Sequence, residues 1–200
     1  IFKENLSDLI TITFLYLVLI AIIYAIDPSN EKVDSAFDLI LSIICGIAQM
    51  ILTLGFYKSV LDTVDGDKPR IETLFNNRKP TLILHYILGS VLIGVGVLLG
   101  LIFFIIPGIY LAIRLQFYTY VLLEQEKCDC MKALSTSWAM TEGHVVNLFA
   151  IGLLSFFIVI AGVIVFLIGI LAAIPISIIM LALAYRILSI EMQKKLPLNL

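Results

Sequence analysis

The chain has 200 residues, of which 61% are hydrophobic and 14% charged, and its formal net charge is −2. A soluble domain carries about 25% charged residues, and a chain of this length has too little interior to hide so much apolar surface from water. The composition therefore excludes a soluble enzyme, and the lack of a basic surplus excludes a nucleic-acid-binding domain. We expect a single integral membrane domain over residues 1–200.

Six apolar stretches of about the length of a membrane span follow one another. A helix needs about 20 apolar residues to cross a hydrocarbon core of about 30 Å. Residues 143–185 contain no Asp, Glu, Lys or Arg and are too many for one crossing, so we expect a return near Pro175. Residues 80–113 are likewise uncharged, and we expect a return at Pro107-Gly108. The predicted spans are 9–26, 36–61, 81–106, 109–125, 144–170 and 174–190.

The apolar runs are continuous and lack the alternation of a membrane β-barrel, so the predicted fold is an all-α polytopic helical bundle. Its connections alternate in charge. The basic residues of one side are Lys3, Lys68, Arg70, Arg78, Lys79, Lys127, Lys132, Lys194 and Lys195, whereas the other side has only Lys32. Because cytosolic connections are enriched in Lys and Arg, we expect three hairpins with both termini in the cytosol.

Each of the two longer cytosolic loops contains a short amphipathic stretch. Residues that share one helical face are Ile71, Leu74 and Phe75 in the first loop, and Met131, Leu134 and Trp138 in the second. Such stretches lie at the level of the lipid headgroups, where aromatic side chains are favoured. We therefore expect two short interfacial helices, anchored by Phe75 and Trp138.

Arg114 lies inside the fourth predicted span, where an ionisable side chain is costly unless it is paired or reaches the interface. We consider an ion pair with Asp38, near the outer end of the second span. We also consider snorkelling, and a site for a lipid phosphate or a substrate. Gln49 and Gln116 would extend the same polar cluster, although such residues more often form hydrogen bonds between helices.

A second polar set gathers near the cytosolic ends of the spans. Its members are His85, Glu124, His144 and Arg186, together with Asn147 and Glu191. Within it we expect an ion pair between Glu124 and Arg186. Sets of His and Glu can hold metals or relay protons, but this spacing contains no metal motif. The spacing of Cys128 and Cys130 does not match a zinc site either, so we expect free thiols there and at Cys45, no metal and no cofactor.

An ordered set of residues from the third turn to the fifth span resembles a known membrane family. The set is Pro107-Gly108-Ile109-Tyr110-Leu111, Arg114, Val121-Leu122-Leu123-Glu124, Ala133-Leu134, Ser137-Trp138, Thr141 and Gly143-His144. It resembles the membrane-domain family of glycerophosphodiester phosphodiesterases, which includes stand-alone YciC-like inner-membrane proteins, over residues 60–190. The resemblance implies a multi-span module of a bacterial cytoplasmic (inner) membrane. In fused relatives a separate soluble barrel carries the hydrolase chemistry; we find no such barrel in this sequence and expect no hydrolase activity.

Two functions remain open. The first is a non-enzymatic scaffold or accessory subunit that packs against membrane lipids, a partner membrane protein or a second copy of itself. The second is a small transporter or lipid-handling protein that uses the polar cluster around Arg114. A continuous polar cavity reaching Arg114 would favour the transporter, and an exposed apolar groove would favour the scaffold.

Overall fold

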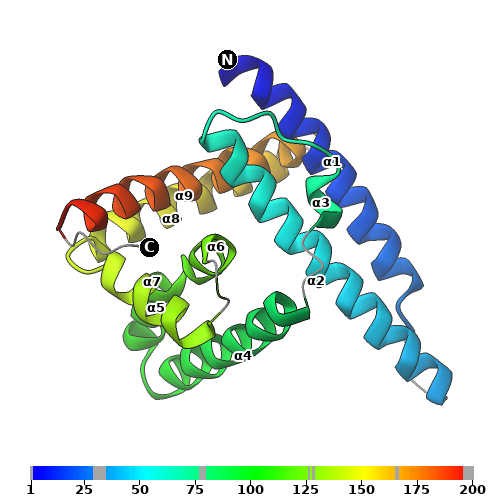
Figure 1. Ribbon diagram of the computed structural model, residues 1–200, viewed down its shortest axis with the longest axis horizontal. Coiled ribbons are helices and arrows are strands. Elements are labelled where there is room, and N and C mark those ends of the chain that lie inside the picture. Colours follow the sequence, from blue (N-terminus) through cyan, green and yellow to red (C-terminus); the bar gives the residue numbers. More distant parts are fainter. Residues whose placement is uncertain are drawn as a thin grey trace. The chain divides into compact units, whose positions relative to one another are not determined.

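The computed structural model describes residues 2–28, 35–76, 80–125, 127, 129–164 and 167–195. The regular elements of these residues are helices, and strands are absent from them (Figure 1). Six stretches of the described chain are long and apolar enough to cross a membrane. The chain is therefore an all-α, multi-pass membrane protein, which confirms the fold class predicted from the sequence.

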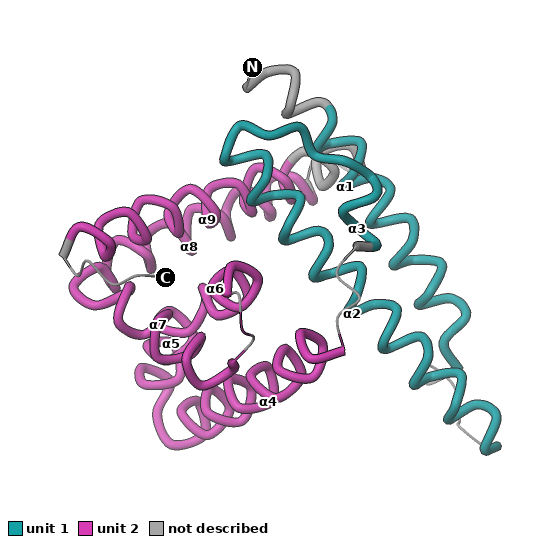
Figure 2. The backbone as a smooth tube through the Cα atoms, in the orientation of Figure 1, with its two compact units in different colours: residues 1–78 teal, residues 79–200 magenta. Residues whose placement is uncertain are grey.

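The chain divides into two compact units, residues 1–78 and residues 79–200 (Figure 2). The first unit contains α1 (Phe2–Ile26), α2 (Ala36–Val64) and α3 (Thr73–Asn76). The second contains α4 (Pro80–Phe103), α5 (Ile105–Leu115), α6 (Tyr118–Glu124), α7 (Cys130–Met140), α8 (Val145–Ile164) and α9 (Leu167–Lys195). Each unit is described by itself below.

In the first unit, local sequence signals fix both ends of α2. Ser35 and Asp38 form a capping box, in which the Ser35 backbone N–H donates to Asp38 Oδ2 (3.0 Å) and the Asp38 N–H donates to Ser35 Oγ (3.1 Å). At the other end Gly66 has φ +90°, and the Asp67 N–H donates to the Asp62 carbonyl (2.8 Å). This is a Schellman motif, which requires the left-handed conformation that glycine adopts without strain.

The loop after α2 folds back onto that helix at Gly55. Leu74 of α3 is completely buried, and a Cβ atom added to Gly55 would lie 2.2 Å from the Leu74 carbonyl oxygen. Ile71 and Phe75 are exposed. The helix expected here is only four residues long, and of the three residues predicted to share its apolar face Leu74 alone is buried, where α3 packs on α2.

Two returns between spans differ from the predicted ones. α4 ends at Phe103 and α5 begins at Ile105, so the return is at Phe104, and Pro107 lies in the first turn of α5. A proline is tolerated there because the first helical N–H groups have no intrahelical acceptor. α8 ends at Ile164 and α9 begins at Leu167, and Pro175 lies inside α9 rather than at a return. Membrane helices accommodate an internal proline because neighbouring groups satisfy the freed carbonyl.

The fourth span, Ile105–Glu124, has 20 residues and is broken, because α5 ends at Leu115 and α6 begins at Tyr118. Neither proline nor glycine lies at the break, and the sequence did not predict it. Counted from Ile105, Arg114 is the tenth residue of this span, which places it in the middle rather than near the outer end. The break and Arg114 together define the site described next.

Candidate functional site

The break in the fourth span is covered by hydroxyl groups of α7. The last carbonyls of a helix lack intrahelical donors and need other partners when water is absent. The Arg114 carbonyl oxygen accepts a hydrogen bond from Ser137 Oγ (3.0 Å), and Thr141 Oγ1 lies 3.3 Å from the same oxygen; both residues are fully buried. The single hydroxyl proton of Thr141 also has the carbonyl oxygens of Ser137 (2.9 Å) and Trp138 (3.0 Å) as acceptors. α7 is thereby held against the end of α5.

The side chain of Arg114 is enclosed by aromatic rings. The residue is 4% exposed, and its guanidinium carbon lies 4.2 Å from the Trp138 ring centroid and 5.6 Å from that of Tyr110. The two rings meet edge to face at 5.9 Å. Such cation–π contacts contribute about 2 kcal/mol or more when desolvated. The Nε atom is buried without a hydrogen-bond partner, and the described part of this unit supplies no carboxylate to the guanidinium.

The proposed extensions of this cluster belong to different parts of the fold. Asp38 and Gln49 lie in the first unit, where Asp38 caps α2 and Gln49 is exposed, its backbone carbonyl accepting from Thr53 Oγ1 (2.8 Å). The ion pair between Asp38 and Arg114 stays a prediction. Gln116 caps the C-terminus of α5, and its Nε2 is buried without a partner.

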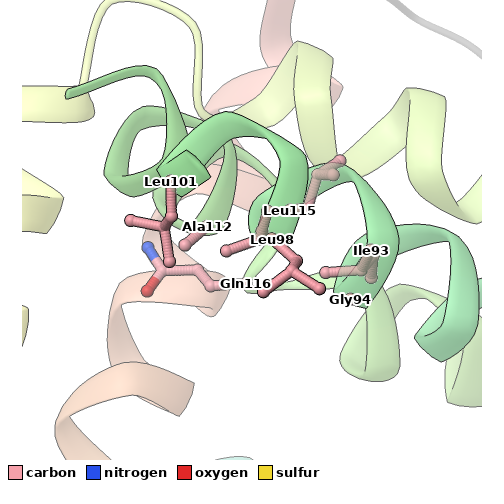
Figure 3. Close-up of a pocket in the computed structure, with 8 residues that line it drawn as sticks. Ile93, Gly94, Leu98, Leu101, Ala112, Leu115 and Gln116 are labelled. Carbon is pink, nitrogen blue, oxygen red and sulfur yellow. The ribbon is translucent and has the colours of Figure 1, made fainter. Parts of the chain in front are cut away.

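An open groove of about 410 Å³ runs between α4 and the end of α5 (Figure 3). Its lining residues are Ile93, Gly94, Val97, Leu98, Leu101, Ala112, Leu115 and Gln116. Gln116 is the one of these residues with a polar side chain, as Figure 3 shows among the sticks. Arg114 does not line the groove, because its side chain contacts α7 on another face of α5. The groove is thus an apolar surface and gives no polar route to Arg114.

The second polar set is only partly assembled. Arg186 Nη1 lies 2.5 Å from Glu124 Oε1, so the expected ion pair is present, and the Tyr185 hydroxyl donates to Glu124 Oε2. These contacts tie α6 to α9. His144 pairs with Glu191, another member of the set (Nε2 to Oε2, 3.3 Å).

His85 uses its ring within its own helix. Its Nδ1 lies 2.7 Å from the Thr81 carbonyl oxygen, four residues earlier in α4. Groups of three or more His, Cys, Asp or Glu placed to hold a metal ion are absent from the described residues. The members of this set described above therefore form ion pairs and local hydrogen bonds.

The cysteine pair belongs to the start of a helix. Asp129 between the two cysteines is the N-cap of α7, and its Oδ1 accepts from the Met131 N–H (2.9 Å). Cys45 and Cys130 are buried free thiols. Cys128 lies outside the described residues, as do the basic residues Lys32, Arg78 and Lys79.

The helix expected around Trp138 is present as α7. Met131 and Trp138 are exposed, whereas Ala133 and Ser137 are buried on the opposite face. Trp138 packs on Tyr110 and Arg114, a contact that the sequence reasoning missed. Two spacings could have indicated it: Tyr110 and Arg114 are four residues apart on one helix, and so are Ser137 and Thr141 on the other.

Comparisons of the chain with protein-family models, with curated proteins and with solved structures find no match. The resemblance to the membrane-domain family of glycerophosphodiester phosphodiesterases stays a prediction. Function is therefore argued from the geometry.

Proposed function

We propose that the chain is a non-enzymatic membrane module, a scaffold or accessory subunit that packs its apolar helices against lipids and a partner membrane protein. The observation that carries this proposal is how little the spans bury against one another. Only 6% of the most apolar stretch of α4 is buried, and only 11% of that of α8. Helices with so much free apolar surface are suited to contacts outside the chain.

The groove between α4 and α5 is where we place the contact with a partner. Membrane helices associate through close packing at small residues, because lipid tails already satisfy apolar side chains. Gly94 lies in the groove, and Gly94 and Gly96 have open space where a Cβ atom would stand. A partner helix can therefore approach the α4 backbone closely at this point.

Photo-crosslinking in native membranes tests this role. A photoreactive amino acid at Leu98 in the groove is compared with one at Ile187, which is exposed on α9. We expect a discrete protein adduct from Leu98 that Gly94→Leu removes, and lipid adducts alone from Ile187. Lipid adducts alone from both positions would contradict an accessory role.

We also propose that the protein resides in a bacterial cytoplasmic membrane with both termini in the cytosol. Nine Lys and Arg residues belong to the termini and to the two longer connections, against Lys32 on the other side. An even number of crossings returns the C-terminus to the side of the N-terminus. The family resemblance supports the same location.

A lipid-handling protein is the second candidate, and the buried Arg114 with its unpartnered Nε favours it. Proteoliposomes with a fluorescent phospholipid in both leaflets separate the two functions. A lipid-handling protein would accelerate exchange between leaflets, and Arg114→Gln would abolish the acceleration. A scaffold would leave exchange at the rate of protein-free vesicles.

A further inference from the structure

Three side chains around the broken span present hydrogen-bond donors that the protein does not use. These are the guanidinium of Arg114, the hydroxyl of Tyr110 and the indole N–H of Trp138. None of the three groups has a hydrogen-bond acceptor among the described residues. We propose that Tyr110, Arg114 and Trp138 form a binding site for a phosphate group, supplied by the headgroup of an anionic phospholipid.

The ring contacts of Arg114 do not use its donors. A ring face attracts the positive charge but offers no lone pair, and a guanidinium carries five N–H donors. Nε is buried without a partner in a residue that is 4% exposed. Burying a donor without an acceptor costs about 1–3 kcal/mol, and more for a charged group. An acceptor from outside the chain would remove that penalty.

The chemistry of the cluster selects an anion with several oxygens. Arg binds phosphate through two parallel hydrogen bonds, and the described residues of this unit place no carboxylate against it. Tyr110 and Trp138 are 41% and 38% exposed, so a ligand from outside the chain can reach both residues. Tyr and Trp are also the residues that favour headgroup contact in membrane proteins. Local thinning of the bilayer allows a headgroup to reach an arginine inside a span.

The site is separate from the α4–α5 groove and does not depend on the proposed function. Arg114 does not line the groove, and an accessory module and a lipid-handling protein could each hold a phospholipid here. If the crosslinking experiment yields no protein adduct, the phosphate site is unaffected. If the quenching experiment described next shows no phosphate binding, the proposed accessory role is unaffected.

Trp138 is the only tryptophan of the chain and reports on its own surroundings. The full chain is reconstituted in phosphatidylcholine vesicles that contain increasing fractions of brominated phosphatidylglycerol or brominated phosphatidylcholine. Bromine quenches indole fluorescence on contact, so the quenching curves give the relative affinity of the two headgroups. Both lipids carry a phosphate, but the choline cation of phosphatidylcholine neutralises its phosphate and competes with the donors of the site. We therefore expect a preference of about tenfold for phosphatidylglycerol, whose headgroup has a net negative charge.

Arg114→Gln should reduce this preference to about one, because a neutral amide no longer favours an anionic headgroup over a zwitterionic one. Arg70→Gln removes the same charge from an exposed loop and should retain the preference. Tyr110→Phe keeps the ring, removes one donor and should lower the preference in part, which keeps the test valid if Arg114→Gln does not fold.

Inorganic phosphate identifies the source of the anion. If it changes Trp138 emission in wild type but not in Arg114→Gln, without any lipid preference, the site holds a soluble phosphate. Equal quenching by both lipids with no effect of phosphate would overturn the proposal.

Discussion

Arg114 shows how this protein keeps a charge inside an apolar environment. An arginine in the middle of a span costs about 2.5–3.5 kcal/mol on insertion scales, and two aromatic contacts offset part of that cost. The backbone of the same residue is stabilised separately, through Ser137 and Thr141. One residue thus joins α5 to α7 twice, through its ring contacts and through its carbonyl oxygen.

Gly55 allows α3 to pack closely on α2 in the first unit. A Cβ atom there would lie 2.2 Å from a backbone oxygen, so α2 and α3 would have to separate. We expect Gly55→Ala to lower the free energy of unfolding by about 1–3 kcal/mol, the usual cost of overpacking. The measurement is thermal unfolding in detergent. Gly46→Ala on the same helix is the control, because nothing lies within 4 Å of its added Cβ atom. Equal unfolding temperatures for the two variants would contradict this account.

At the level of helices, the break between α5 and α6 depends on hydroxyls from a third helix. We expect Ser137→Ala alone to cost about 1 kcal/mol, since the Thr141 hydroxyl, 3.3 Å away, can then turn to the Arg114 carbonyl oxygen. Ser137→Ala with Thr141→Val should cost more than the sum of the single changes, because the buried carbonyl then loses both side-chain donors. Thermal unfolding followed by Trp138 emission measures both effects. Ser135→Ala is the control, since its hydroxyl is exposed and bonds within α7. Strictly additive losses of unfolding free energy would show that the two hydroxyls do not replace each other as donors to the Arg114 carbonyl oxygen.

The spans could be predicted from hydropathy, but their ends could not. Prolines were expected to mark the returns, and both expectations were wrong because a proline fits the first turn of α5 and the interior of α9. The break after Leu115 has no proline or glycine to announce it. The break is accompanied by tertiary contacts with α7, and a local sequence pattern does not predict such contacts.

The candidate site was also predicted only in part. Arg114 could be identified from charge alone, and the pair of Glu124 with Arg186 from matching depths. The partners of Arg114 could not, because Trp138 was interpreted as a lipid anchor. A sequence pattern shows that Trp138 is on the apolar face of a helix, but not that the helix docks on a broken span.

The chain divides into two compact units, and their independence in folding can be tested with one fluorophore. Gly55→Leu should disrupt the packing of α3 on α2 within residues 1–78. Trp138 lies in the unit of residues 79–200, so we expect its emission maximum and its accessibility to quenchers to remain those of wild type. Limited proteolysis of the same sample should show faster cleavage in the connection between α2 and α3. A red shift of Trp138 emission in Gly55→Leu would show that the units fold as one.

The orientation of the chain in the membrane follows from its charge asymmetry, and cysteine labelling can decide it. Cys130 is buried and a poor probe, so the three natural cysteines are first replaced by alanine. Single cysteines are then placed at Asp27 in the first connection, at Asp67 in the second and at Gln193 near the C-terminus. The connection of Asp67 contains Lys68 and Arg70, and Gln193 precedes Lys194, so both belong to the basic, cytosolic side. A membrane-impermeant maleimide added to spheroplasts should therefore modify Asp27→Cys at once, and Asp67→Cys and Gln193→Cys only after lysis. The reverse pattern would invert the topology, and modification of Gln193→Cys without Asp67→Cys would show that the number of crossings between them is odd.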